Sequence, residues 1–273
     1  MTQLNALSRN LCFAMLLAAA LSPAMHAQAV PPKPCPVAAL TPVLPSSAPI
    51  AAEDAAHHTA TPAVAPGQLI VIGFMGGNVS PSNLVHREAL IAKDLQKRYP
   101  AAVYAEVFAN HDGPAALHTV TQLLDKNKNG CLNATEKSTA RIVIFGHSWG
   151  ASEAITLARR LNDLSIPVLL TIQVDSVEKF YEDDADIPPN VHEAINFYQT
   201  QGMLHGRSLI IATDPKQTKI LGNFKTSYRT TQTQVPIVDF PWYARTFMRE
   251  HIEIENDPAI WDKIEALIQT KII

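Results

Sequence analysis

Apolar runs of strand length alternate with helical patterns from Gly67 to the end of the chain, and this alternation constrains the fold most. The runs are almost continuously apolar, as expected for strands that are covered on both faces of a sheet. They span 69–74, 102–108, 141–145, 168–174 and 208–212, and the helical patterns span 81–99, 115–124, 151–161, 191–199 and 258–269. The alternation predicts an α/β fold with a mostly parallel sheet, helices on both faces and no large lid. Functional side chains are expected just beyond the carboxyl ends of the strands.

The first 66 residues have a different character. Residues 1–10 carry one charge, at Arg9, and an apolar run at 11–21 and an A-x-A pattern at 27–29 follow. This order is typical of a secretory signal peptide. Residues 30–66 contain nine prolines, which predicts an extended linker. We therefore expect a signal peptide at 1–29, a Pro/Ala-rich linker at 30–66 and one folded domain at 67–273.

These segments set expectations for the location and partners of the chain. A signal peptide predicts a secreted protein, or one of the periplasm or cell envelope. The apolar run is too short to span a bilayer comfortably, so no integral membrane span is expected after cleavage. The net charge is −3, which is a poor match for nucleic acid. The sequence leaves the oligomeric state open.

The most specific motif is Gly146-His147-Ser148-Trp149-Gly150, which lies between a predicted strand and a predicted helix. In this context, G-x-S-x-G predicts a tight turn that holds the serine in a strained conformation and raises its hydroxyl above the sheet. The flanking glycines avoid collisions between strand and helix. The pattern indicates a nucleophilic serine, Ser148, which needs a base to become reactive.

With this motif the chain resembles the α/β-hydrolase superfamily, and in particular small secreted bacterial serine hydrolases of the GHSWG type, which are esterase- or lipase-like. The stretches 174–177, 196–199 and 220–223 add to the resemblance. The resemblance implies Ser148 as nucleophile, an acid and a histidine later in the chain, and hydrolysis of an ester or related acyl bond. It implies no cofactor for catalysis.

Three histidines follow Ser148, and His251 matches the family position because it lies directly before the final predicted helix. His192 falls in a predicted helix and His205 in a turn, where packing explains both. Two acids remain open as the group that orients the base. Asp175 ends the strand after that of the nucleophile, and Asp214 ends the next one. The context around Asp175 favours it, and the other acid is then expected to cap a turn.

An oxyanion hole needs two pre-aimed backbone donors. The amide of Trp149, directly after the nucleophile, is the first candidate. The second is expected at the exit of the first strand, where Phe74 fits the family position best and Met75 is next. Gly76 and Gly77 would let the backbone approach a ligand closely.

A second motif, at 125–136, matches the calcium loop D-x-[DN]-x-[DN]-G-x5-E. Side-chain oxygens, one backbone carbonyl and a final carboxylate are the ligands that Ca²⁺ prefers. The predicted ligands are Asp125, Asn127, Asn129, the carbonyl of Cys131, and Glu136. Two carboxylates neutralise the ion incompletely, so a weak structural Ca²⁺ site is expected, and an Asn-Gly turn without metal is the alternative.

The other metal and redox expectations are few. The cysteines left after signal cleavage, Cys35 and Cys131, could form a disulfide in an oxidising compartment, and the sequence leaves this open. They lie far apart and no H-x-x-x-H spacing occurs, so the sequence does not predict a zinc site.

Two functions follow from these patterns. The first is a secreted serine hydrolase that cleaves a small-molecule or lipid ester through an acyl-enzyme on Ser148. The alternative is a catalytically inactive hydrolase-fold binding module with a structural calcium loop. The acyl chain and the leaving group of the substrate are open in both.

Overall fold

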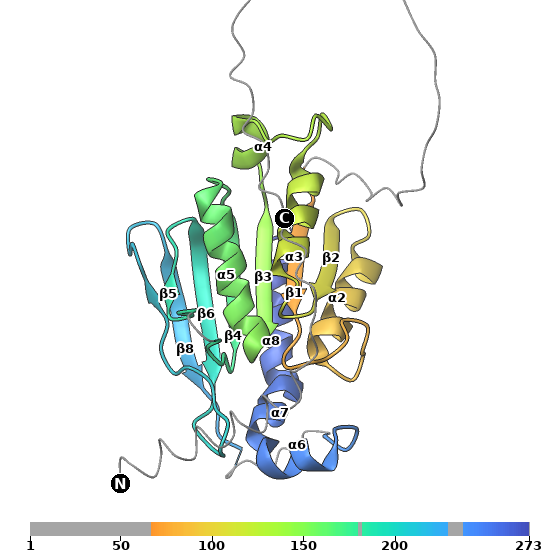
Figure 1. Ribbon diagram of the computed structural model, residues 1–273, viewed down its shortest axis with the longest axis vertical. Helices are drawn as coiled ribbons and strands as arrows, with labels where there is room; N and C mark the ends of the chain where they lie inside the picture. The colour runs from red at the N-terminus through yellow and green to blue at the C-terminus, as the bar shows by residue number, and fades with distance from the viewer. Residues whose placement is uncertain (1–66, 180–181, 229–236, 273) are drawn as a thin grey trace, which may run out of the picture.

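The computed structural model describes residues 67–179, 182–228 and 237–272, so the expected signal peptide, the linker and Cys35 lie outside the described residues. A six-stranded sheet forms the centre of the molecule, in the order β2-β1-β3-β4-β6-β8, and all its paired strands are parallel (Figure 1). The strands are β1 (Leu69–Phe74), β2 (Val103–Phe108), β3 (Ile142–His147), β4 (Val168–Val174), β6 (Val191–Tyr198) and β8 (Lys219–Lys225).

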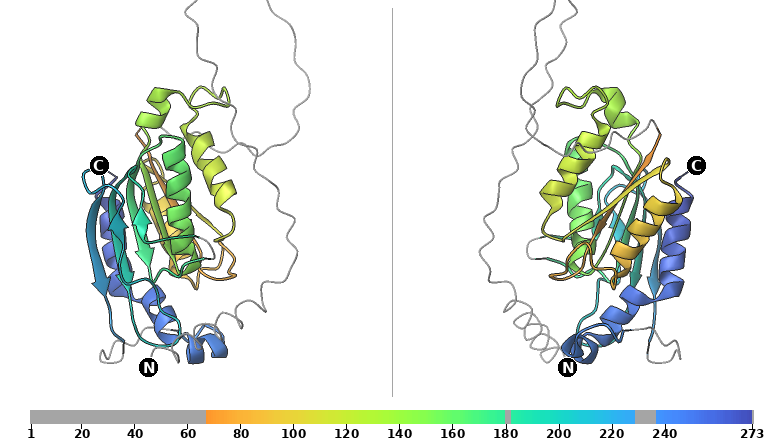
Figure 2. Two further views of the ribbon diagram at one scale, coloured as in Figure 1. Left: turned by 60° about the vertical axis from the view of Figure 1, so that its left-hand side comes forward. Right: turned by 90° about the vertical axis from the view of Figure 1, so that its right-hand side faces the viewer.

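Helices cover both faces of this sheet (Figure 2). One face carries α3 (Gly113–Leu124) and α5 (Trp149–Asp163), which pack into one apolar cluster with Ile70, Ile142 and their neighbours. The other face carries α2 (Arg87–Arg98) and α8 (Pro258–Gln269) in a second cluster. The α/β class with a parallel sheet between two helical layers is thus confirmed.

The sequence misassigned two stretches, 191–199 and 208–212, and did not predict β8. Residues 191–199 were expected to form a helix, but 191–198 form β6, which pairs with β4 on one side and β8 on the other. Most of the expected strand at 208–212 is not a strand; only β7 (Ile211–Ala212) is, and it pairs with β5 (Asp186–Ile187) in a separate two-stranded sheet.

The elements around the carboxyl ends of the strands form one end of the molecule. The short helix α4 (Ala134–Ser138) lies at the opposite end, where β3 begins (Figure 1). Near the carboxyl ends lie α6 (Trp242–Phe247) and α7 (Arg249–Asn256), neither of which the sequence predicted. None of the described helices has the length and apolar character needed to cross a membrane.

Candidate active site

Ser148 lies at the turn between β3 and α5, in a backbone conformation that few non-glycine residues adopt. Its φ is 56° and its ψ is −126°, and its N–H donates to Val174 O at 3.0 Å. The flanking glycines are required because a side chain at either position would collide with the neighbouring backbone. A Cβ at Gly146 would lie 2.4 Å from the backbone of Gly150, and one at Gly150 would lie 2.3 Å from Phe74 O. The motif therefore forms the strained strand–turn–helix that presents a serine above a sheet.

Asp175 and His251 form a buried hydrogen-bonded pair beside this turn. Asp175 directly follows β4, and His251 lies in the first turn of α7 rather than in the loop where it was expected. His251 Nδ1 lies 2.7 Å from Asp175 Oδ2, and the side chains are 2% and 0% exposed. Because a carboxylate only accepts, Nδ1 donates the proton and Nε2 is left as the basic nitrogen.

Three further donors fix the carboxylate of Asp175. Gln199 donates its backbone N–H to Oδ1 at 3.1 Å and its Nε2 to Oδ2 at 2.8 Å. The N–H of Gly206 donates to Oδ1 at 2.8 Å, and a Cβ at Gly206 would lie 2.2 Å from the Asp175 backbone. Gln199 and Gly206 thus hold the acid, a role that the sequence did not reveal. The only signal was the family-like stretch at 196–199.

The alternative acid lies elsewhere. Asp214 is half-buried and accepts from Lys216 N and Gln217 Nε2, each at 2.9 Å, so it caps the turn after β7. His192 is exposed on β6, and His205 is half-buried in the loop after it. None of these three makes a hydrogen bond to Asp175 or His251 in the described part of the chain.

Ser148 and His251 lie on neighbouring segments. The ring of His147, the residue before the serine, lies tilted with its centroid 4.4 Å from that of His251, and its Nε2 donates to His251 O at 3.1 Å. Ser148 is 7% exposed. Within the described residues its hydroxyl makes no hydrogen bond to His251, and such contacts are often long before substrate binds. The structure therefore brings Ser148 next to a residue that contacts His251, and His251 bonds to Asp175, with no hydrogen bond between Ser148 and His251 among the described residues.

The loop after β1 packs directly against this turn. The carbonyl oxygens of Phe74 and Met75 approach Gly150, and a Cβ at Gly76 would lie 3.2 Å from Ser148 Cβ. The N–H of Met75 donates to Phe108 O at 2.9 Å, and the alternation of the ladder directs that of Phe74 toward β3. Trp149 begins α5, so its N–H belongs to the first helical turn, which has no intrahelical partner.

The loop at 125–136 lies far from this site, between α3 and β3. Its acidic side chains accept backbone N–H groups of the loop. Asp125 accepts from Asn129 at 3.2 Å and Gly130 at 2.8 Å, and Glu136 accepts from Lys126 at 3.0 Å and from Asn133 at 2.9 Å. The remaining predicted ligand residues belong to the same turn: Asn127 Oδ1 accepts from Asn129 N, and Asn129 Oδ1 from Cys131 N.

Cys131 of this loop is disulfide-bonded. The candidate partner Cys35 lies outside the described residues. The ligand side chains expected for calcium thus lie together in one compact loop, and calcium binding stays a prediction.

The comparisons with known proteins are sparse. No family model matches the chain, and no curated protein matches it. One solved structure that is similar is described as "RedJ with PEG molecule bound in the active site". The similarity covers 80% of this chain and 95% of that one, at 12% identity and a TM-score of 0.40. A likeness of this size says nothing about the reaction or substrate of this chain.

Proposed function

We propose that the protein is a secreted serine hydrolase that cleaves carboxylic esters through an acyl-enzyme on Ser148. One observation carries the proposal. A buried Asp–His pair lies beside a strained serine at the carboxyl ends of parallel strands, and each part comes from a different segment. The secreted location rests on the predicted signal peptide. The resemblance to GHSWG-type hydrolases supports the same reaction class.

The chemistry follows from the roles of these groups. His251 Nε2 accepts the hydroxyl proton as Ser148 Oγ attacks the ester carbonyl, and the proton passes to the leaving alcohol. Asp175 keeps the imidazole in the required tautomer and stabilises its positive charge. The Trp149 amide stabilises the oxyanion. The N–H groups of Phe74 and Met75, the other predicted donors, face the neighbouring strands β3 and β2. Water activated by His251 then hydrolyses the acyl-enzyme.

Covalent labelling tests the proposal directly. We expect a fluorophosphonate probe to label the wild-type chain but not Ser148→Ala, and a series of p-nitrophenyl esters to be hydrolysed only by the wild type. Asp214→Asn is the matched control, because that acid bonds to Lys216 and Gln217 in its own turn and, among the described residues, not to the Asp–His pair. A folded wild-type chain that neither labels nor hydrolyses any ester refutes the hydrolase and supports the alternative, an inactive binding module.

Calcium binding at 125–136 is a second, separate proposal. The support is the ligand pattern and the compact loop in which Asp125 and Glu136 lie. The role proposed for the ion is structural, since the loop leads through α4 into β3 and so to the nucleophile.

A further inference from the structure

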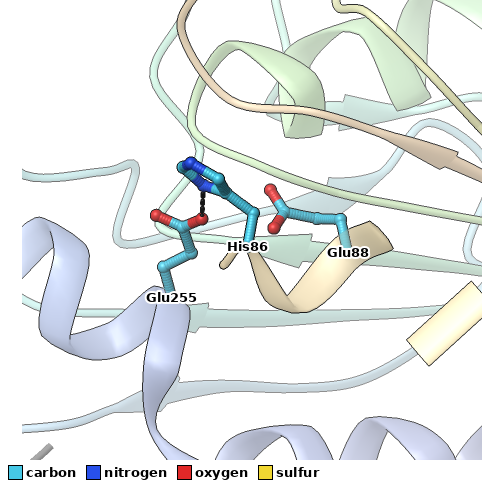
Figure 3. A group of neighbouring side chains, drawn as sticks. All are labelled: His86, Glu88 and Glu255. Carbon is cyan, nitrogen blue, oxygen red and sulfur yellow. Dashed lines mark hydrogen bonds and ion pairs between the residues drawn. The ribbon is translucent and has the colours of Figure 1, made fainter. Parts of the chain in front are cut away.

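Behind the nucleophile lies a buried group of two histidines and two glutamates that the proposed reaction does not use. His86 and Glu88 come from the start of α2, His147 ends β3, and Glu255 belongs to α7. Glu88, Glu255 and His147 are 0%, 2% and 3% exposed, and the His86 side chain is 12% exposed. Figure 3 shows His86, Glu88 and Glu255 pointing toward one another from α2 and α7.

The polar atoms of this group lie close together. His86 Nδ1 contacts Glu255 Oε1, and because a carboxylate only accepts, Nδ1 donates its proton there; a bound cation would replace that proton. His147 Nδ1 lies 3.5 Å from Glu255 Oε2 and 3.9 Å from Glu88 Oε1. One ligand atom from each of His86, Glu88 and Glu255 lies within 4.8 Å of the others. The ligand atoms of three side chains therefore converge, and His147 Nδ1 lies beside the two carboxylates.

The hydrogen bond made by His147 shows that hydrogen-bond acceptors face one another within this group. Its Nε2 lies 3.1 Å from His251 O, and a carbonyl only accepts, so Nε2 carries the proton of the neutral ring. Nδ1 then presents a lone pair to the carboxylates of Glu88 and Glu255. Glu88 Oε2 is buried and has no hydrogen-bond partner among the described residues. A positive species between these atoms would satisfy them together.

We propose that His86, Glu88, His147 and Glu255 bind one divalent cation of the zinc class. Bonds of 2.0–2.2 Å in a tetrahedron place neighbouring ligand atoms about 3.3 Å apart. The separations of 3.5 and 3.9 Å around His147 Nδ1 are close to that value. Two nitrogens and two carboxylates suit zinc and its transition-metal neighbours, whereas Ca²⁺ and Mg²⁺ prefer an all-oxygen set. The backbone bond from His147 Nε2 is the outer contact that commonly orients a ligating histidine.

Such an ion would join the segments that carry the active site. It would connect α2, β3 and α7, and the last two hold the residue before Ser148 and the proposed base. Gly76 N also lies 3.4 Å from Glu88 Oε1, which links the 74–77 loop to the same group. Its role is therefore to position the site, and no step of ester cleavage passes through it.

Metal loading of the purified full-length chain tests the proposal. The chain is stripped with a chelator, equilibrated with micromolar ZnCl₂ in excess Ca²⁺, desalted and analysed for metal. We expect one zinc per chain, and a Co²⁺-loaded sample with the visible absorption of a tetrahedral site. His86→Ala and Glu255→Gln should each weaken zinc binding by about 10-fold or more. His118→Ala, an exposed histidine on α3, is the matched control and should bind zinc as the wild type does.

The outcomes are separable from those of the hydrolase proposal. Ser148→Ala should keep its zinc, so an inactive enzyme that binds the metal leaves this proposal standing. A wild-type chain that is folded by circular dichroism but takes up no zinc overturns it, and protons then satisfy the cluster instead. Zinc bound equally well by folded His86→Ala and Glu255→Gln also overturns it, because the ion then lies elsewhere.

Discussion

Gln199 is the residue that links the acid of the site to two separate loops. Its side chain donates to Asp175 Oδ2, the same oxygen that contacts His251, and to Leu204 O. We predict that Gln199→Leu lowers kcat about 10-fold at nearly unchanged KM, because the loss of a hydrogen bond to a buried charge frees the carboxylate to turn. Steady-state kinetics on a p-nitrophenyl ester measure both constants.

Gln96→Leu provides the control for this substitution. Gln96 is an exposed residue of α2 whose Oε1 accepts from Ala105 N at 2.9 Å, away from the Asp–His pair. It should retain wild-type kcat. Wild-type kcat in Gln199→Leu would show that Asp175 keeps its orientation without the amide.

A sequence motif reveals a site residue when neighbouring residues determine its geometry. It does not reveal residues that act through contacts distant in sequence. Ser148 was predictable because its strain, its glycines and its helix lie within five consecutive residues. Gln199 and Gly206 act on Asp175 through contacts 24 and 31 residues apart in sequence, and no spacing rule encodes them. The zinc-class cluster is the extreme case, because His86 and Glu255 meet across 169 residues.

At the scale of elements, the loop at 125–136 and the start of helix α4 form one hydrogen-bonded unit, in which Asn133 and Glu136 cap each other's backbone N–H. Asn133 caps α4, and Glu136 N donates back to it at 3.0 Å. With the weak affinity expected of two carboxylates, about 10⁻⁴ to 10⁻³ M, 10 mM Ca²⁺ should stabilise the chain by roughly 1.4–2.7 kcal/mol. Thermal denaturation with Ca²⁺ and with a chelator measures the shift in Tm.

Two comparisons make the calcium test specific. Asp125→Asn should lose the Ca²⁺-dependent rise in Tm, whereas Asp214→Asn, in the exposed turn after β7, should keep it. An equal rise in Tm in Asp125→Asn would show that the ion binds outside the loop. No rise in Tm in the wild type would show that the loop is an Asn-Gly turn without metal.

Helix α6 carries an exposed aromatic surface next to the helix of the proposed base. Trp242, Tyr243 and Phe247 are 68%, 53% and 43% exposed, and α6 is followed directly by α7 (Figure 1). Apolar surface of this kind binds apolar ligands. We predict that Trp242→Ser lowers kcat/KM for a decanoate ester about 5-fold or more while changing that for an acetate ester less than 2-fold, as expected when an apolar contact with the longer acyl chain is lost.

The matched control for α6 lies on another surface. Leu209 is 58% exposed in the loop before β7, and Leu209→Ser should leave both esters unchanged. If Trp242→Ser lowers kcat/KM equally for the acetate and the decanoate ester, the substitution has instead displaced α7.

The strand β6 shows why some elements could not be predicted. Its sequence, VHEAINFY, places apolar residues at positions 1, 4 and 5, which also suits one face of a helix. Pairing with β4 and β8 makes it a strand, since both neighbours are needed to bury it. The terminal helix α8 was predicted with its bounds, because Asp257, Pro258 and the apolar stripe signal it locally.

For the molecule as a whole, the sheet separates two apolar cores. Ile155 of α5 belongs to one cluster and Ile264 of α8 to the other, and both side chains are fully buried. Each Ile→Val change should cost about 0.5–1.5 kcal/mol of unfolding free energy. Because the residues share no cluster, the double variant should cost the sum within about 0.5 kcal/mol.

Urea denaturation distinguishes a single cooperative unit from two independent layers. If the sheet couples the two cores into one transition, the single and double variants shift the midpoint and leave the slope m unchanged. A second transition, or a lower m in one variant only, would show that one helical layer unfolds alone. The Asp–His pair joins β4 to α7, and the proposed metal ligands join α2, β3 and α7. A single transition would mean that the proposed active site is lost only when the whole fold is lost.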